Sequence, residues 1–153
     1  MPKRRFKNVS DIIAFAIERE IAAAEGYGQM AGQATTPGLR DMLLELKAEE
    51  EKHRKLLEGM TNTQLKESAL PPVEDMGLSD ALAEEPMTPG MTFQDLLIFA
   101  AKKEKKAEEL YRGLTRLPAA AGERRVFEFL AGQERAHKLK LETEYERHVL
   151  SED

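Results

Sequence analysis

Apolar residues recur every three or four positions in four segments of this chain, which predicts four amphipathic α-helices. The predicted helices span about residues 9–34, 37–59, 93–117 and 119–148. Asn8 with Asp11, and Thr92 with Asp95, have the spacing of N-terminal caps and predict where the first and third helices begin. Strand signals are absent from the sequence. We therefore expect an all-α fold.

The stretch between the second and third predicted helices, residues 60–91, lacks this strong periodicity. It contains prolines at positions 71, 72, 86 and 89, and only a weak helical pattern over 78–84. So long a segment without regular structure is uncommon inside a compact domain. We expect it to cross over along the length of a helical bundle, within a single domain that comprises residues 1–153.

The chain repeats itself at an offset of 84 residues. When residues 11–58 are aligned with residues 95–142, 14 of the 48 positions are identical. Unrelated sequences would share roughly three. The identities include a Tyr and a His, which helical composition alone does not explain. We interpret the chain as two copies of one antiparallel helical hairpin.

Each copy carries the same polar set, in which a Glu is followed by a Tyr after seven residues, a second Glu after thirty and a His three residues later. These residues are Glu20, Tyr27, Glu50 and His53 in the first copy, and Glu104, Tyr111, Glu134 and His137 in the second. Spacings of three and seven keep side chains on one helical face, so the Glu-His pair interrupts an apolar stripe in both copies. The charged neighbours, including Glu49, Glu51 and Lys52, are interpreted as solvated.

The hairpin turns place the paired carboxylates at the same height. The midpoint between Glu20 and Glu50 is residue 35, and the midpoint between Glu104 and Glu134 is residue 119; both lie in predicted turns. Packing the hairpins together would gather four Glu and two His near the centre of one bundle. Buried carboxylates are costly unless they are paired or neutralised, whereas two divalent cations would balance four of them. The pattern predicts a dinuclear site for iron, manganese or zinc.

Composition narrows the classes of function further. The net charge of −5 argues against nucleic acid as the main partner, and the absence of cysteine excludes disulfides, zinc–thiolate sites and iron–sulfur clusters in this chain. The longest early apolar run, residues 12–17, is too short for a signal peptide or a membrane span. We expect a cytoplasmic protein with no membrane partner.

The sequence resembles the rubrerythrin-like diiron proteins of the ferritin-like superfamily. The resemblance extends from about Ile12 to Tyr145 and rests on four segments, AIEREIAAAEGYGQMA, LKAEEEKHRKLLE, KKEKKAEELYRGL and LAGQERAHKLKLETEY. It implies a ferritin-like four-helix bundle made of two hairpins. In it, Glu20 and Glu104 would bind metal from the first and third helices, and the two Glu-x-x-His pairs would bind it from the second and fourth.

The resemblance also raises two expectations at the edge of the site. Rubrerythrins use an additional carboxylate on the third helix, for which Glu108, four residues after Glu104, is the candidate. Full rubrerythrins carry a Cys-rich rubredoxin domain that these 153 residues do not include, so a separate electron-donor protein is implied. Tyr27 and Tyr111 are interpreted either as core tyrosines or as hydrogen-bond donors that orient a ligand.

Three functions are compatible with these residues. The leading hypothesis is a diiron-carboxylate oxidoreductase with two iron ions, which oxidises Fe(II), reduces peroxide or does both. The second is a protein that binds iron or another divalent metal without turnover, and the third is a structural bundle without metal. We also expect a homodimer, since helical bundles of this kind often bury exposed apolar residues by pairing.

Overall fold

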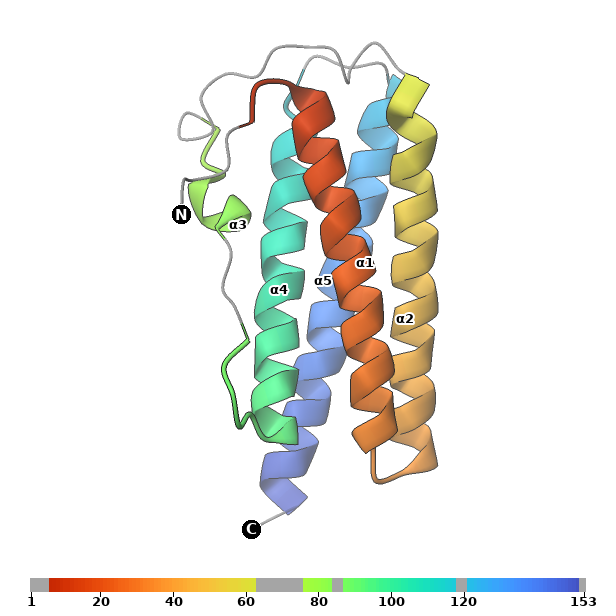
Figure 1. Ribbon diagram of the computed structural model, residues 1–153, viewed down its shortest axis with the longest axis vertical. Coiled ribbons are helices and arrows are strands. Elements are labelled where there is room, and N and C mark those ends of the chain that lie inside the picture. The colour runs from red at the N-terminus through yellow and green to blue at the C-terminus, as the bar shows by residue number, and fades with distance from the viewer. Residues whose placement is uncertain (1–5, 63–75, 84–86, 118–120, 152–153) are drawn as a thin grey trace.

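The computed structural model describes residues 6–62, 76–83, 87–117 and 121–151, and the elements in these ranges are all helices. They are α1 (Val9–Gln33), α2 (Pro37–Glu58), the 3₁₀ turn η1 (Gly59–Asn62), α3 (Ser79–Leu82), α4 (Phe93–Leu114) and α5 (Ala121–Ser151). The four long helices lie side by side, α1 paired with α2 and α4 paired with α5 (Figure 1). The predicted all-α fold of two antiparallel hairpins is confirmed.

Helices α2 and α4 run in the same direction, so the chain must return along the bundle between them (Figure 1). Of the predicted crossover, residues 60–91, the parts 63–75 and 84–86 lie outside the described residues. The weak helical pattern over 78–84 corresponds to α3, which is four residues long and lies beside α4.

Side-chain caps decide where the helices begin. The backbone N–H of Asp11 donates to Asn8 Oδ1 over 3.0 Å, and Thr92 and Asp95 form a reciprocal capping box at the start of α4. Both predicted caps are confirmed. Helix α4 ends at Leu114, before the predicted position 117, because the backbone N–H groups of residues 116 and 117 bond three residues back and close a tight turn.

The apolar core is divided into two clusters along the bundle. Apolar side chains fill the end where α1 begins, including Ile12, Phe15, Leu57, Leu114 and Phe127, and others fill the opposite end, including Met30, Leu39, Leu43, Leu97 and Leu141. In every long helix, the buried Glu or Glu-His positions fall between the two clusters. No helix in the described ranges is long and apolar enough to cross a membrane.

Residues 78–83 are held against both hairpins. Arg19 on α1 donates from its guanidinium to the carbonyl oxygens of Ala81 and Ala83, over 2.5 and 3.0 Å. The Leu78 side chain lies so close to Gly113 on α4 that a Cβ there would approach Leu78 Cδ2 to 2.5 Å. A side chain at position 113 would therefore force Leu78 to move, and residues 78–83 are held against the bundle beside the site.

Candidate metal centre

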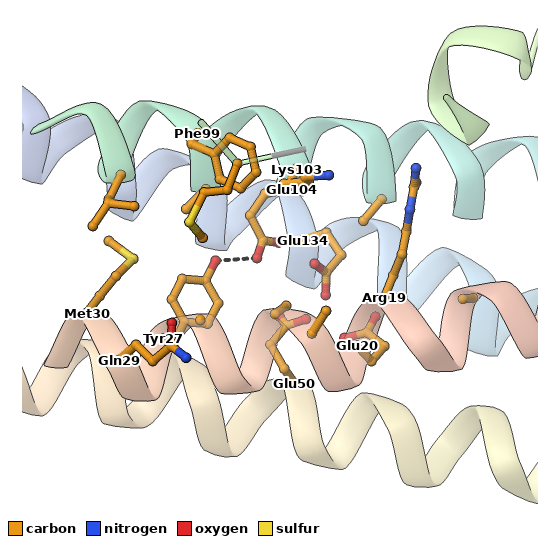
Figure 2. A pocket seen from close by; sticks show the side chains of 18 of the residues that line it. Arg19, Glu20, Tyr27, Gln29, Met30, Glu50, Phe99, Lys103, Glu104 and Glu134 are labelled. Atoms are coloured by element: carbon orange, nitrogen blue, oxygen red, sulfur yellow. Dashed lines mark hydrogen bonds between the residues drawn. The ribbon is translucent and has the colours of Figure 1, made fainter. Parts of the chain in front are cut away.

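Six polar residues are buried in the middle of the bundle, each no more than 2% exposed. They are Glu20 on α1, Glu50 and His53 on α2, Glu104 on α4, and Glu134 and His137 on α5. Figure 2 shows the carboxylates of the four Glu gathered between the helices. The structure thus brings together all six residues that the sequence marks as metal ligands.

The donor atoms form two overlapping groups, each of which could hold one metal ion. One group consists of Glu20, Glu50, His53 and Glu134, and the other of Glu50, Glu104, Glu134 and His137. Within each group, one donor atom per residue lies within 4.8 Å of all the others. Glu50 and Glu134 belong to both groups, so they are placed to hold two ions side by side.

The donor atoms that face one another lack hydrogen-bond partners. This is what we expect of residues that bind a metal ion. These atoms are Glu20 Oε2, Glu50 Oε1, His53 Nδ1, Glu104 Oε2, Glu134 Oε1 and His137 Nδ1. His53 Nδ1 is 2.6 Å from Glu134 Oε1, and His137 Nδ1 is 2.6 Å from Glu50 Oε1, yet neither contact has hydrogen-bond geometry. Buried polar atoms seldom remain unpaired. Oxygen and imidazole nitrogen donors converging in this way fit divalent transition-metal ions.

Burial sets the protonation of the carboxylates. Burial raises the pKa of both Glu50 and Glu134 well above the usual range, and the nearby charge of Glu104 raises each pKa further. Burial also acts to raise the pKa of Glu20, but contacts with Glu50, His53 and Tyr111 outweigh it and lower that pKa. Burial and the neighbouring carboxylates therefore favour the protonated forms of Glu50 and Glu134 in the metal-free cluster.

The two histidines face the cluster in the same way. Their rings are stacked 5.6 Å apart at 12°, and each directs Nδ1 toward the carboxylates. Burial lowers the pKa of His137, but contacts with Glu104 and Glu50 outweigh burial and raise that pKa to about 11. A metal ion at Nδ1 must therefore displace a proton from this ring.

The two tyrosines connect the hairpins to each other. Tyr27 on α1 donates from its hydroxyl to Glu104 on α4, and Tyr111 on α4 donates to Glu20 on α1. Burial and the charge of the accepting carboxylate raise the pKa of each tyrosine well above 10, so the hydroxyls stay protonated donors. Both tyrosines are therefore buried core residues, and each hydroxyl bonds to a carboxylate of the predicted ligand set.

Two other carboxylates lie outside the six. Glu108, the candidate for an additional ligand, bonds to the guanidinium of Arg112 one turn along α4 and belongs to neither group. Glu49, interpreted from the sequence as solvated, instead contacts His137 at Nε2, the ring nitrogen opposite the cluster, and only 33% of its side chain is exposed. The signal that could have drawn attention to Glu49 is the repeat, since the matching residue is Gln133.

A cavity of about 360 Å³ between α1 and α4 reaches the cluster. It is lined mainly by small and apolar side chains, among them Ala16, Ala23, Gly26, Met30, Phe99, Ala100 and Ala107. Glu20, Glu50, Glu104 and Glu134 also border the cavity, and so do Arg19 and Lys103 (Figure 2). The cavity gives small molecules a route to the carboxylates.

Comparisons with known proteins agree with this geometry. The family model for rubrerythrin matches residues 11–145. A Thermotoga maritima protein described as a candidate ferritin-like diiron-carboxylate protein has a similar fold, with a TM-score of 0.72 and 20% identity over 95% of this chain and 98% of that one. A hypothetical Pyrococcus furiosus protein has a TM-score of 0.71 and 27% identity, over 91% and 89%. No curated protein sequence matches significantly.

The family match extends over most of the chain and includes all six buried ligand candidates. The predicted ferritin-like bundle is confirmed by the structural similarity. Two buried Glu and His groups of the kind that a dinuclear metal site requires lie at its centre. The chain therefore belongs to the rubrerythrin family.

Proposed function

We propose that this protein is a diiron-carboxylate oxidoreductase, which oxidises Fe(II), reduces peroxide or does both. The observation that carries the proposal is the convergence of six buried donor atoms from four helices into two groups that share Glu50 and Glu134. The description of the Thermotoga maritima protein as diiron-carboxylate favours iron. Manganese or zinc would suit the same donors.

The chain's own residues divide the work at this site. Two bound iron ions would supply the electrons for reduction of the oxidant. The carboxylates and imidazoles hold the ions, and the tyrosines keep Glu20 and Glu104 in place from the opposite hairpin. The pKa values of Glu50 and Glu134 are raised in the metal-free cluster, so these two carboxylates would take up protons when a metal ion leaves.

The cavity between α1 and α4 supports a small oxidant as the second substrate. Its alanines and Gly26 leave an apolar passage that reaches Glu20, Glu50 and Glu104 directly. O2 is small and apolar, and hydrogen peroxide is small and uncharged, so neither has a charge that an apolar passage would exclude. The two apolar clusters close the bundle above and below the site and limit access by water from the ends.

The proposal includes partners. Repeated peroxide reduction consumes electrons that two iron ions cannot supply indefinitely, and a separate electron-donor protein would replace them. A second copy of the chain is the other proposed partner, because the described surface leaves large apolar side chains such as Ile21, Leu44 and Phe129 about 39–51% exposed. Light scattering of the purified protein would measure its mass and test the dimer.

The proposal is tested by loading the protein anaerobically with Fe(II) and mixing it with hydrogen peroxide or O2 in a stopped-flow instrument. We expect oxidation of two Fe(II) per chain, faster than that of free Fe(II) in the same buffer. The Glu50→Ala variant, which alters both ligand groups, is the matched control and should lose the acceleration. Oxidation no faster than in buffer, in protein that holds two ions, would overturn the proposal.

A second candidate, metal binding without turnover, is favoured by the position of Glu108. That carboxylate is bonded to Arg112, so the cluster has no additional third-helix ligand in the arrangement described. Supplying excess peroxide and a chemical reductant separates the two functions. A metal-binding protein would consume one equivalent of oxidant and stop, whereas the oxidoreductase would continue.

A further inference from the structure

The two histidines of the site have different outer neighbours. Each ring directs Nδ1 toward the cluster, which leaves Nε2 on the opposite side. His137 Nε2 contacts the Glu49 carboxylate on α2. The described carboxylates within 4 Å of His53 all face its Nδ1 atom, and none contacts Nε2.

The internal repeat shows that this difference is built into the sequence. Glu49 precedes Glu50, and the matching residue before Glu134 is Gln133, an uncharged amide. The predicted ligands are identical in the two copies of the repeat. The copies differ at the residue before the Glu-x-x-His pair, which is Glu49 in one and Gln133 in the other. Helix geometry explains the reach, since consecutive residues are turned by about 100°. Glu50 faces the centre while Glu49 faces the flank of α5.

A carboxylate at Nε2 changes what a histidine can do at Nδ1. It accepts the Nε2 proton, selects the tautomer with a free lone pair on Nδ1, fixes the ring orientation and makes the nitrogen a stronger donor. Residues in this role typically change metal affinity by about ten- to hundredfold. The repeat matches Gln133 to Glu49 and His53 to His137, and among the described residues no carboxylate contacts His53 Nε2.

We propose that Glu49 makes the two metal positions unequal. It positions and polarises His137, so the position formed by Glu50, Glu104, Glu134 and His137 binds its ion first and more tightly. The position with Glu20 and His53 fills second and exchanges its ion more readily. This inference rests on the metal-binding part of the proposed function and not on turnover.

The test is a titration of the metal-free protein with Co²⁺, whose visible absorption reports coordination without any redox reaction. We expect two resolved binding steps in the wild type. Glu49→Ala should weaken the tighter step by about ten- to hundredfold and merge the two steps. Glu49→Gln keeps an uncharged hydrogen-bond acceptor, so its affinity at the tighter step should lie between those of the wild type and Glu49→Ala. Circular dichroism would verify that each variant keeps its helices.

Matched variants separate this role from a general effect of charge. Glu51→Ala removes the same charge from an exposed position two residues away and should leave both steps unchanged. Gln133→Glu gives His53 the partner that it lacks and should tighten the weaker step. The inference is overturned if wild type shows two equal sites, or if Glu49→Ala and Glu51→Ala titrate alike.

The result is independent of catalysis. Two unequal steps that respond to Glu49 would support the inference even if the loaded protein reacted with neither peroxide nor O2. Two equal steps that ignore Glu49 would overturn the inference while leaving an oxidoreductase intact. Failure to bind Co²⁺ at all would overturn the inference, and the proposed function would then be judged separately from its own Fe(II) test.

Discussion

The α1–α2 hairpin and the α4–α5 hairpin contribute equal shares to the buried centre. Each supplies one lone Glu, one Glu-x-x-His pair and one tyrosine, and each tyrosine bonds to the lone Glu of the other hairpin. Neither hairpin can complete the site alone, since both ligand groups draw residues from both hairpins. The complete centre therefore exists only when the two hairpins pack together.

The hairpins differ in the residues around that centre. Arg19 and Lys103 occupy matching positions, and each places its charge over a matching ring, Phe15 at 4.3 Å and Phe99 at 5.1 Å. Arg19 additionally binds the carbonyl groups of the crossover. The repeat also matches Glu49 to Gln133. The predicted ligands are therefore identical in the two hairpins, whereas the residues around them differ.

The largest expected effect distinguishes shared ligands from unshared ones. Glu50 belongs to both groups and His53 to one. We expect Glu50→Ala to abolish binding of both ions and His53→Ala to leave about one, as measured by elemental analysis of purified protein. Glu51→Ala, an exposed neighbour, should keep both ions. Two ions in Glu50→Ala would show that the groups do not share this carboxylate.

Removing the metal tests whether the centre joins the hairpins. Each ion bound at a free concentration of 100 times its Kd adds about 2.7 kcal/mol to the free energy of unfolding. Exhaustive chelation should therefore lower the melting temperature measured by circular dichroism, and added Fe(II) or Zn²⁺ should restore it. An unchanged melting temperature would favour the structural bundle without metal.

The stability of the metal-free protein should fall as pH rises. The folded pKa values of Glu50 and Glu134 are raised, so their stabilising protons are fully present below pH 4.5 and are lost as pH rises through the folded values. His137 acts likewise between pH 6.5 and about 11. Glu20, with its lowered pKa, contributes the opposite dependence, which is complete above pH 4.5.

Bound metal should reverse this dependence, because the ions replace those protons and bind more tightly as pH rises. Thermal unfolding at pH 5 to 8, with and without Zn²⁺, would measure both trends. The difference between the two melting temperatures should widen with pH. A difference that stays constant would contradict proton displacement at the cluster.

The crossed tyrosines provide an intermediate effect. In the metal-free protein, Tyr27→Phe and Tyr111→Phe each leave a buried carboxylate oxygen without its donor, which costs about 1–3 kcal/mol. Urea unfolding should give similar losses for both, as the symmetry of the hairpins requires. Tyr145→Phe, a half-buried residue away from the cluster, is the control. If these variants lose no more free energy of unfolding than Tyr145→Phe, the two tyrosine–glutamate bonds do not stabilise the fold.

The smallest expected effect concerns the crossover. Arg19→Met removes two hydrogen bonds to the carbonyl groups of Ala81 and Ala83 and should cost about 1 kcal/mol in urea unfolding. Lys52→Met removes an exposed cation from α2 and should cost less. Equal losses would mean that the anchoring of the crossover adds nothing measurable at Arg19.

The ligands were predictable because their pattern is local and repeated. A helical spacing of three places Glu50 and His53 on one face, and the repeat places Glu134 and His137 on another. The equal distances from each turn then bring Glu20 and Glu104 level with them. The contact between Glu49 and His137 was not predictable in this way, because it joins α2 to α5 across an interface whose rotation the sequence pattern does not specify.

The sequence alone determined the four long helices, the duplicated hairpin and the six buried ligand candidates, since periodicity and spacing depend only on helix geometry. Only the tertiary structure decided which tyrosine bonds to which carboxylate, and that Glu49 contacts the outer nitrogen of one histidine of the two. The physical reason is that these contacts join separate helices. They follow from how side chains meet once the two apolar clusters have packed.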